Sequence, residues 1–130
     1  MTIRQIKNKL INEGELRLRH TSLRSNPLVI DLVLTKACNL ACIFCKDYET
    51  EGEKKVSVEK VARLADKLFP SAVQLSICSG GEPYLHNGLE DILRLAKRYK
   101  VSTWVLSNGM IFDDARVRNI VRHELITRHG

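Results

Sequence analysis

Three short apolar runs alternate with segments of helical periodicity, and this alternation constrains the fold more than any other feature of the chain. The runs are Leu28–Leu34, Val73–Cys78 and Val101–Leu106. The first is almost continuously aliphatic and β-branched, as expected for a strand buried on both faces of a parallel sheet. Because parallel strands need a crossover connection, the pattern predicts βαβ units with right-handed crossovers.

The helical segments between and after these runs carry start signals. Ser57–Leu68 begins with a capping residue and is followed by a proline, which predicts where that helix stops. Asn87 and Glu90 have capping spacing ahead of a second helix, and Asp113 or Asp114 caps a third.

The first 27 residues predict a helix with an irregular lead-in to the first strand. Thr2 and Gln5 have the spacing of a capping box, and Gly14 is placed to close the helix. One helix face carries Ile3, Ile6 and Leu10. We therefore expect an N-terminal helical extension over residues 1–27 and a single domain over residues 28–130.

The length limits the architecture. A chain of 130 residues fits one domain, whereas a complete (β/α)8 barrel typically needs about 250 residues. The predicted fold class is α/β: an incomplete parallel (β/α) barrel of about three βα units with an N-terminal helical extension.

Composition excludes other classes. The chain is 44% hydrophobic and 28% charged, which is ordinary for a globular protein and argues against disorder. No apolar run approaches the ~20 residues of a membrane span, and Arg4, Lys7 and Lys9 lie where a signal peptide would be apolar. We expect a cytoplasmic protein with no membrane partner. The net charge of +6 is scattered, so a nucleic-acid partner is not expected either.

Three of the four cysteines, Cys38, Cys42 and Cys45, fall within eight residues, and Cys78 is the fourth. Clustered thiols in a reducing compartment indicate a metal site or catalysis rather than disulfides. Three soft ligands suit zinc or an iron–sulfur cluster. Structural zinc needs a fourth ligand, which Cys78 could supply only if its side chain pointed to the same face, and we expect it to be a packed core thiol. A [4Fe–4S] cluster held by three cysteines keeps one iron open for another ligand.

Chemistry-bearing residues follow each predicted strand. The cysteine segment follows the first, Ser79–Pro83 the second and Ser107–Gly109 the third. In parallel α/β folds the carboxyl ends of the strands lie together and bind ligands, so we expect these three segments to share one rim.

The segment Cys38–Cys45, CNLACIFC, resembles the cluster motif C-x3-C-x-(aromatic)-C of radical S-adenosylmethionine (radical SAM) enzymes, with Phe44 in the aromatic place. Gly80–Pro83, GGEP, resembles the second motif of that superfamily. The two occur in the family's order, each after a predicted strand, and the resemblance covers residues 28–110, the N-terminal half of the family's core domain.

The resemblance implies ligands for two cofactors. The three clustered cysteines would bind three irons of a [4Fe–4S] cluster, and S-adenosylmethionine would chelate the fourth iron. Phe44 would lie beside the adenine, and Gly80, Gly81 and Glu82 would contact the methionyl amino group. Pro83 would stiffen that turn. Ser107-Asn108-Gly109 resembles the Thr-Asn-Gly found after the third strand in several of these enzymes, which implies a ligand-facing role for Ser107 and Asn108; a plain turn is the alternative.

The reaction that the resemblance implies is reductive cleavage of S-adenosylmethionine to methionine and a 5′-deoxyadenosyl radical, which takes a hydrogen atom from a substrate. An electron donor such as a flavodoxin or ferredoxin would supply the electron. The substrate, a small molecule or a peptide, is not readable. The alternative is a non-enzymatic iron–sulfur or metal-binding module that acts with a partner chain.

Two further expectations come from the count of βα units. The family barrel generally has six units, so we expect a fragment or truncated product that is inactive alone, or else a short module that borrows the missing half. Uncovered strand edges and an uncovered apolar interior predict self-association. Two residues have simpler interpretations: Glu82 as a helix cap and Trp104 as a core side chain.

Overall fold

A parallel four-stranded sheet forms the centre of the molecule. The computed structural model describes residues 1–43, 45, 55–111, 115–123 and 125–129. The strands follow the chain in spatial order, all parallel: β1 (Val29–Asp31), β2 (Gln74–Ile77), β3 (Ser102–Val105) and β4 (Arg128–His129). Three of these strands were predicted, and β4, a two-residue strand after the third predicted helix, was not.

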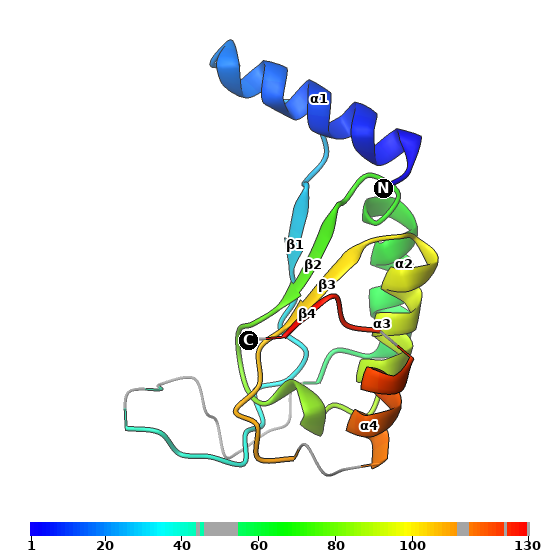
Figure 1. Ribbon diagram of the computed structural model, residues 1–130. Helices are drawn as coiled ribbons and strands as arrows, with labels where there is room; N and C mark the ends of the chain where they lie inside the picture. Colours follow the sequence, from blue (N-terminus) through cyan, green and yellow to red (C-terminus); the bar gives the residue numbers. More distant parts are fainter. Residues whose placement is uncertain (44, 46–54, 112–114, 124, 130) are drawn as a thin grey trace.

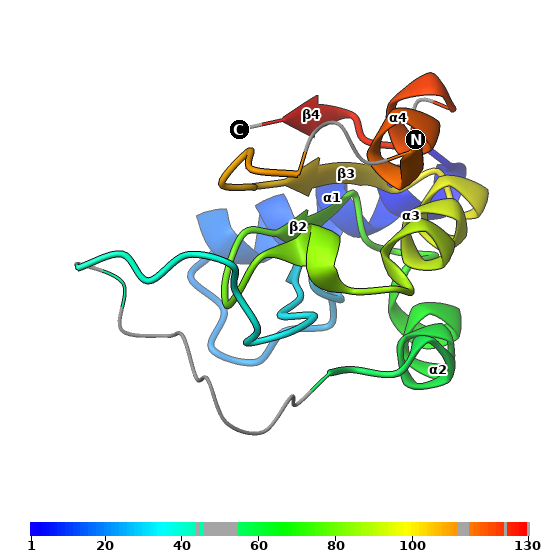
Figure 2. The same ribbon diagram turned by 90° about the horizontal axis from the view of Figure 1, so that it is seen from below.

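The helices that follow the strands all cover the same face of this sheet. They are α2 (Val58–Leu68), α3 (Leu89–Arg98) and α4 (Ala115–Arg122), and a 3-10 turn, η1 (Pro83–Leu85), precedes α3. Figures 1 and 2 show the three helices on one side of the strands. Sequential strand order with helices on one side is the arrangement of a barrel wall rather than of a doubly wound sheet, which confirms the predicted partial barrel.

The hydrophobic core lies between the sheet and these helices. Leu75, Ile77 and Val105 point into it from the strands, and Ile92 and Leu93 meet them from α3, all at most 1% exposed. Since side chains alternate across a strand, the residues between them face the other way.

Trp104 lies on this opposite face, and its prediction as a core residue is wrong. Its neighbours Thr103 and Val105 are each 1% exposed, whereas Trp104 is 39% exposed. The strand period therefore places Trp104 on the face that carries no helix. Cys78, expected to be a packed core thiol, is only half-buried for a related reason, because Ile77 beside it takes the position on the helix side.

The predicted helix starts are partly confirmed. Ser57 caps α2, and its side chain accepts a hydrogen bond from the backbone of Lys60 at 3.3 Å. Asn87 does not cap α3, because Gly88 occupies that position without any side-chain capping bond. Asp113 and Asp114 lie outside the described residues.

The N-terminal helix α1 (Ile3–Arg17) has the predicted capping box between Thr2 and Gln5. It does not end at Gly14 as predicted. The left-handed residue that closes it is Arg19, with φ of 53°, and the backbone N–H of His20 reaches back to the carbonyl of Glu15 at 2.9 Å. This is the hydrogen-bond pattern of a Schellman motif, with a non-glycine residue in the left-handed position.

Helix α1 meets the rest of the protein through polar side chains. Gln5, Asn8 and Glu15 are buried, while Ile3 is 87%, Ile6 47% and Leu10 64% exposed. The aliphatic face predicted from the sequence therefore exists, but it is turned to solvent. Hydrogen bonds rather than apolar burial attach this helix.

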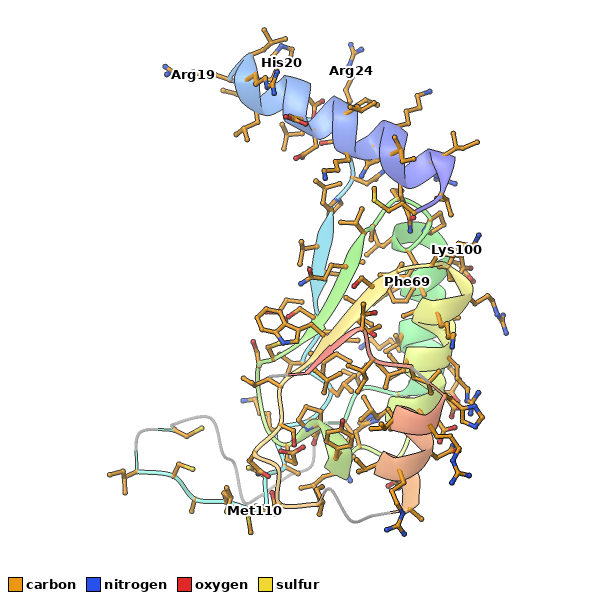
Figure 3. All side chains as sticks on the ribbon, viewed as in Figure 1. Arg19, His20, Arg24, Phe69, Lys100 and Met110 are labelled. Atoms are coloured by element: carbon orange, nitrogen blue, oxygen red, sulfur yellow. The ribbon has the colours of Figure 1, made fainter. Side chains whose placement is uncertain are left out.

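The attachment consists of three groups of contacts. The amide of Gln5 donates to the backbone carbonyl of Tyr99 at 3.1 Å, near Lys100, which Figure 3 labels below the N-terminal part of α1. The amide of Asn8 donates to the carbonyls of Asn26 and Ser71 at 3.0 and 3.1 Å, and its oxygen accepts from the Asn26 N–H at 2.8 Å.

Glu15 makes the third group. Its carboxylate accepts from the backbone N–H of Arg24 at 2.6 Å, from that of Ser25 at 3.3 Å, and from the Ser25 hydroxyl at 2.7 Å. The Ser25 hydroxyl, followed by the Arg24 backbone, lowers the pKa of Glu15. Figure 3 shows Arg19 and His20 at the C-terminal end of α1 and Arg24 beside the middle of the helix.

Helix α1 lies at the end of the molecule opposite the cysteine segment (Figure 1).

Among the described residues, no helix has the length and apolar character needed to cross a bilayer.

We predict that replacing Asn8 lowers the stability much more than replacing Ile6. Asn8→Ala leaves two carbonyls, of Asn26 and Ser71, and the Asn26 N–H without their partner, so the free energy of unfolding should fall by about 1–3 kcal/mol. Ile6→Ser changes a half-exposed side chain and should stay within about 0.5 kcal/mol. Urea unfolding of both variants measures the difference, and equal losses would contradict the polar attachment.

We also predict a pH-dependent contribution from Glu15. Because its pKa is lowered in the folded state, its stabilisation is present above the ordinary glutamate pKa of about 4.3 and is lost as the pH falls through the folded value. Glu15→Gln should therefore be less stable than the parent at neutral pH, and the gap should narrow below pH ~4. Unfolding curves at several pH values test this, with the exposed Glu59→Gln as control. A gap independent of pH would contradict it.

Candidate metal and cofactor site

The segments that follow β1, β2 and β3 meet at one rim of the sheet, as predicted. They lie at the carboxyl ends of the strands, opposite α1 (Figure 1). Here the rim means the described residues 35–43 and 45 after β1, residues 78–83 after β2 and residues 106–110 after β3. Direct hydrogen bonds join these three segments, so their proximity does not rest on topology alone.

The two glycines of the GGEP segment bring the second rim segment against the backbone of the first. The Gly81 N–H donates to the Thr35 carbonyl and the Glu82 N–H to the Ala37 carbonyl, both at 2.8 Å. A Cβ on Gly81 would overlap the Ala37 carbonyl, and Gly80 has φ of 90°, which favours glycine. The close approach shown here is to the chain's own backbone, and contact with a methionyl group stays a prediction.

Glu82 connects all three rim segments. It is 2% exposed. Its Oε1 accepts from the Ser107 hydroxyl at 2.9 Å and from the Tyr84 N–H at 3.2 Å, and its Oε2 accepts from the Asn108 N–H at 2.9 Å. A carboxylate has about four lone-pair positions, of which these bonds use three.

This arrangement changes the expectation for Glu82. The capping role considered from the sequence is present, because Glu82 caps η1 through Tyr84, and Pro83 takes the first position of that turn. The bonds to Ser107 and Asn108 are an additional role that the sequence did not indicate. Burial, and then the nearby charge of Glu82, raise the pKa of Tyr84.

Asn108 extends the network to the cysteine segment. Its side-chain nitrogen donates to Asn39 Oδ1 at 2.7 Å and lies 3.8 Å from Cys38 Sγ. Its side-chain oxygen accepts from the backbone N–H of Met110 at 3.0 Å, and Figure 3 labels Met110 at this end of the molecule. Asn39 was not among the predicted site residues, although its place directly after the first cysteine was a signal.

The cysteine segment is accessible. Cys38 is exposed, Cys42 and Cys45 are half-buried, and the Cys45 N–H donates to the Cys42 carbonyl at 3.1 Å. Among the residues described, no three His, Cys, Asp or Glu side chains are grouped closely enough to hold a metal ion, so the structure does not bring the three thiols to one point. Phe44 lies outside the described residues.

The residues nevertheless fit an iron–sulfur cluster in their donor chemistry. Three thiols, which are soft ligands, occupy one short accessible segment at the carboxyl end of a parallel strand. The rim beside them offers the Asn108 amide as a donor to sulfur. Cys78 follows β2 on a neighbouring segment.

We predict that Glu82 is required for the stability of the rim. Glu82→Ala removes a buried acceptor of three hydrogen bonds, and the free energy of unfolding should fall by about 3 kcal/mol or more. Glu59→Ala, which removes an exposed carboxylate, should cost at most about 1 kcal/mol. Denaturant unfolding of the two variants decides the question, and equal stability would show that the network contributes little.

Comparison with known proteins places this rim in a family. A family model described as "Radical SAM superfamily" matches residues 32–128. The chain is 34% identical over 80 residues to the probable GTP 3′,8-cyclase of Pyrococcus horikoshii, covering 58% of this chain and 25% of that protein. It is 32% identical over 118 residues to the antilisterial bacteriocin subtilosin biosynthesis protein AlbA of Bacillus subtilis, covering 84% of this chain and 26% of AlbA.

A solved structure agrees at the level of the fold. The crystal structure of BtrN in complex with AdoMet and 2-DOIA matches with a TM-score of 0.59 at 17% identity, over 78% of this chain and 44% of that chain. The chain spans about a quarter of the length of the two curated relatives, the Pyrococcus horikoshii cyclase and AlbA. Since the family model covers most of the chain, the protein belongs to the radical SAM superfamily, whose members use a [4Fe–4S] cluster and S-adenosylmethionine.

Proposed function

We propose that this chain forms the cofactor-binding part of a radical SAM enzyme, in which Cys38, Cys42 and Cys45 hold the cluster. The observation that carries the proposal is the hydrogen-bonded union of the two motif segments. The Glu82 N–H binds the Ala37 carbonyl one residue before the first cysteine, and the Asn108 amide reaches that cysteine's sulfur. Motifs far apart in sequence thereby form one rim at the ligand-binding end of a parallel sheet.

When bound, the two cofactors supply a one-electron reductive cleavage of S-adenosylmethionine to methionine and a 5′-deoxyadenosyl radical, which takes a hydrogen atom from the substrate. The protein's own residues provide position. The three thiolates hold the metal, and the Gly81 and Glu82 backbone bonds fix the second rim segment against the first. Phe44, Gly80 and Pro83 are proposed to line the S-adenosylmethionine site with them.

The helix-free face of the sheet is the proposed location of the substrate. Trp104, on β3, is 39% exposed, and Val33 and Leu106, which follow β1 and β3, are 41% and 45% exposed. A radical must be shielded from water and competing groups, so this face needs to be covered during the reaction. We therefore propose that the chain alone is inactive or poorly active and that a further polypeptide segment or partner covers this face.

The electron donor and the substrate are proposed by chemical class. The electron comes from a low-potential protein such as a flavodoxin or ferredoxin. The substrate is a small molecule or a peptide, because the relatives' names point in both directions: one is a GTP cyclase and another acts in bacteriocin biosynthesis.

We predict that anaerobic reconstitution with iron and sulfide gives a brown protein whose iron content depends on the clustered cysteines. Cys38→Ala, Cys42→Ala and Cys45→Ala should each lose most of the bound iron and the visible absorbance, because a three-cysteine site has no spare ligand. Cys78→Ala is the matched control and should keep both. Undiminished iron in the three variants, or loss only in Cys78→Ala, would overturn the site assignment.

The second hypothesis, a non-enzymatic iron–sulfur module, is separated by product analysis. Detection of 5′-deoxyadenosine after reduction of the reconstituted protein with dithionite in the presence of S-adenosylmethionine would exclude the module. Cluster-loaded protein that forms none, alone or with a covering partner, would support the module.

A further inference from the structure

Asn108 makes four polar contacts in the rim: its backbone N–H bonds Glu82, its side-chain nitrogen approaches Asn39 and Cys38, and its side-chain oxygen accepts from Met110. We propose that Asn108 is a positioning residue whose side-chain N–H donates a hydrogen bond to the sulfur of Cys38. This hydrogen bond raises the reduction potential of a cluster held by that sulfur, so the inference rests on the proposed function. The contact that motivates the proposal is the 3.8 Å approach of Asn108 Nδ2 to Cys38 Sγ.

The orientation of the Asn108 amide is determined by its neighbours. The Met110 backbone N–H, at 3.0 Å, can only donate, so the amide oxygen must face it. The amide nitrogen consequently faces the cysteine segment, where one of its hydrogens goes to Asn39 Oδ1 at 2.7 Å. The second hydrogen is then available to Cys38 Sγ.

Hydrogen bonds also fix the backbone that carries the Asn108 amide. The Asn108 N–H binds the buried carboxylate of Glu82, and the Ser107 hydroxyl binds the other oxygen of the same carboxylate. The Gly109 N–H returns to the Ser107 hydroxyl at 3.1 Å, with Gly109 in a left-handed conformation at φ of 76°. The Ser-Asn-Gly turn is thus preorganised before any cofactor arrives.

The physical consequence concerns the charge on the cluster. Reduction adds one negative charge, part of which resides on the thiolate sulfurs. A hydrogen-bond donor aimed at sulfur stabilises the reduced state more than the oxidised state and so raises the potential. Because the donor is fixed in place, it does not have to reorganise when the electron arrives.

The test compares Asn108→Ala and Asn108→Asp with the parent chain. Asn12→Ala is the matched control, since Asn12 also donates its side-chain amide to a neighbour, Ser25 at 3.0 Å, but on α1. Each protein is reconstituted anaerobically, its iron is counted, and its cluster is titrated potentiometrically with detection by electron paramagnetic resonance. Asn108→Asp keeps the side-chain size and the acceptor for Met110. The Ser-Asn-Gly turn should therefore stay folded in this variant even if it is lost in Asn108→Ala.

We expect a more negative potential in Asn108→Ala, with the ratio of reduced to oxidised cluster at fixed potential falling roughly fivefold to tenfold, a tenfold change being about 59 mV. Asn108→Asp, which replaces the donor by a negative charge, should shift further in the same direction, and Asn12→Ala should not shift. Unchanged potentials in both Asn108 variants, with the cluster retained, would overturn this inference alone. A parent chain that takes up no cluster would overturn the proposed function as well.

Discussion

One buried carboxylate holds the functional end of this molecule together. The Glu82 carboxylate is stabilised by an N–H from its own turn together with a hydroxyl and an N–H from the next rim segment. Burying an ionised group is costly unless such donors compensate it. Because the donors come from separate segments, the buried carboxylate is compensated only while those segments keep their positions. Stabilising the carboxylate therefore also fixes the arrangement of the rim.

The sheet brings these segments within reach, and the glycines determine how closely they pack. Strand order 1-2-3-4 places each rim segment next to the one that follows it in sequence. Gly81 then allows backbone-to-backbone contact where any side chain would overlap the Ala37 carbonyl. The GGEP segment is therefore as much a connector within the protein as a candidate ligand surface.

Patterns set by local periodicity and motif order could be predicted from the sequence, whereas choices made by tertiary contacts could not. The three strands, the Ser57 cap and the meeting of the motif segments follow from local signals. Trp104 could not be placed, because alternation says which residues share a face but not which face the helices will cover. The inverted α1 could not be predicted either. An aliphatic stripe normally marks the buried side, and the partners that make the polar side fit, such as Asn26 and Ser71, are supplied by tertiary contacts.

The polar attachment of α1 also determines how freely this helix can move against the rest of the protein. Apolar packing is non-directional and tolerates sliding of one surface along another. Hydrogen bonds are directional, and those of Gln5, Asn8 and Glu15 are spaced along the helix, so moving α1 by a single turn would break all of them together. The helix therefore has one docked register, with its aliphatic side held at a constant angle to the sheet.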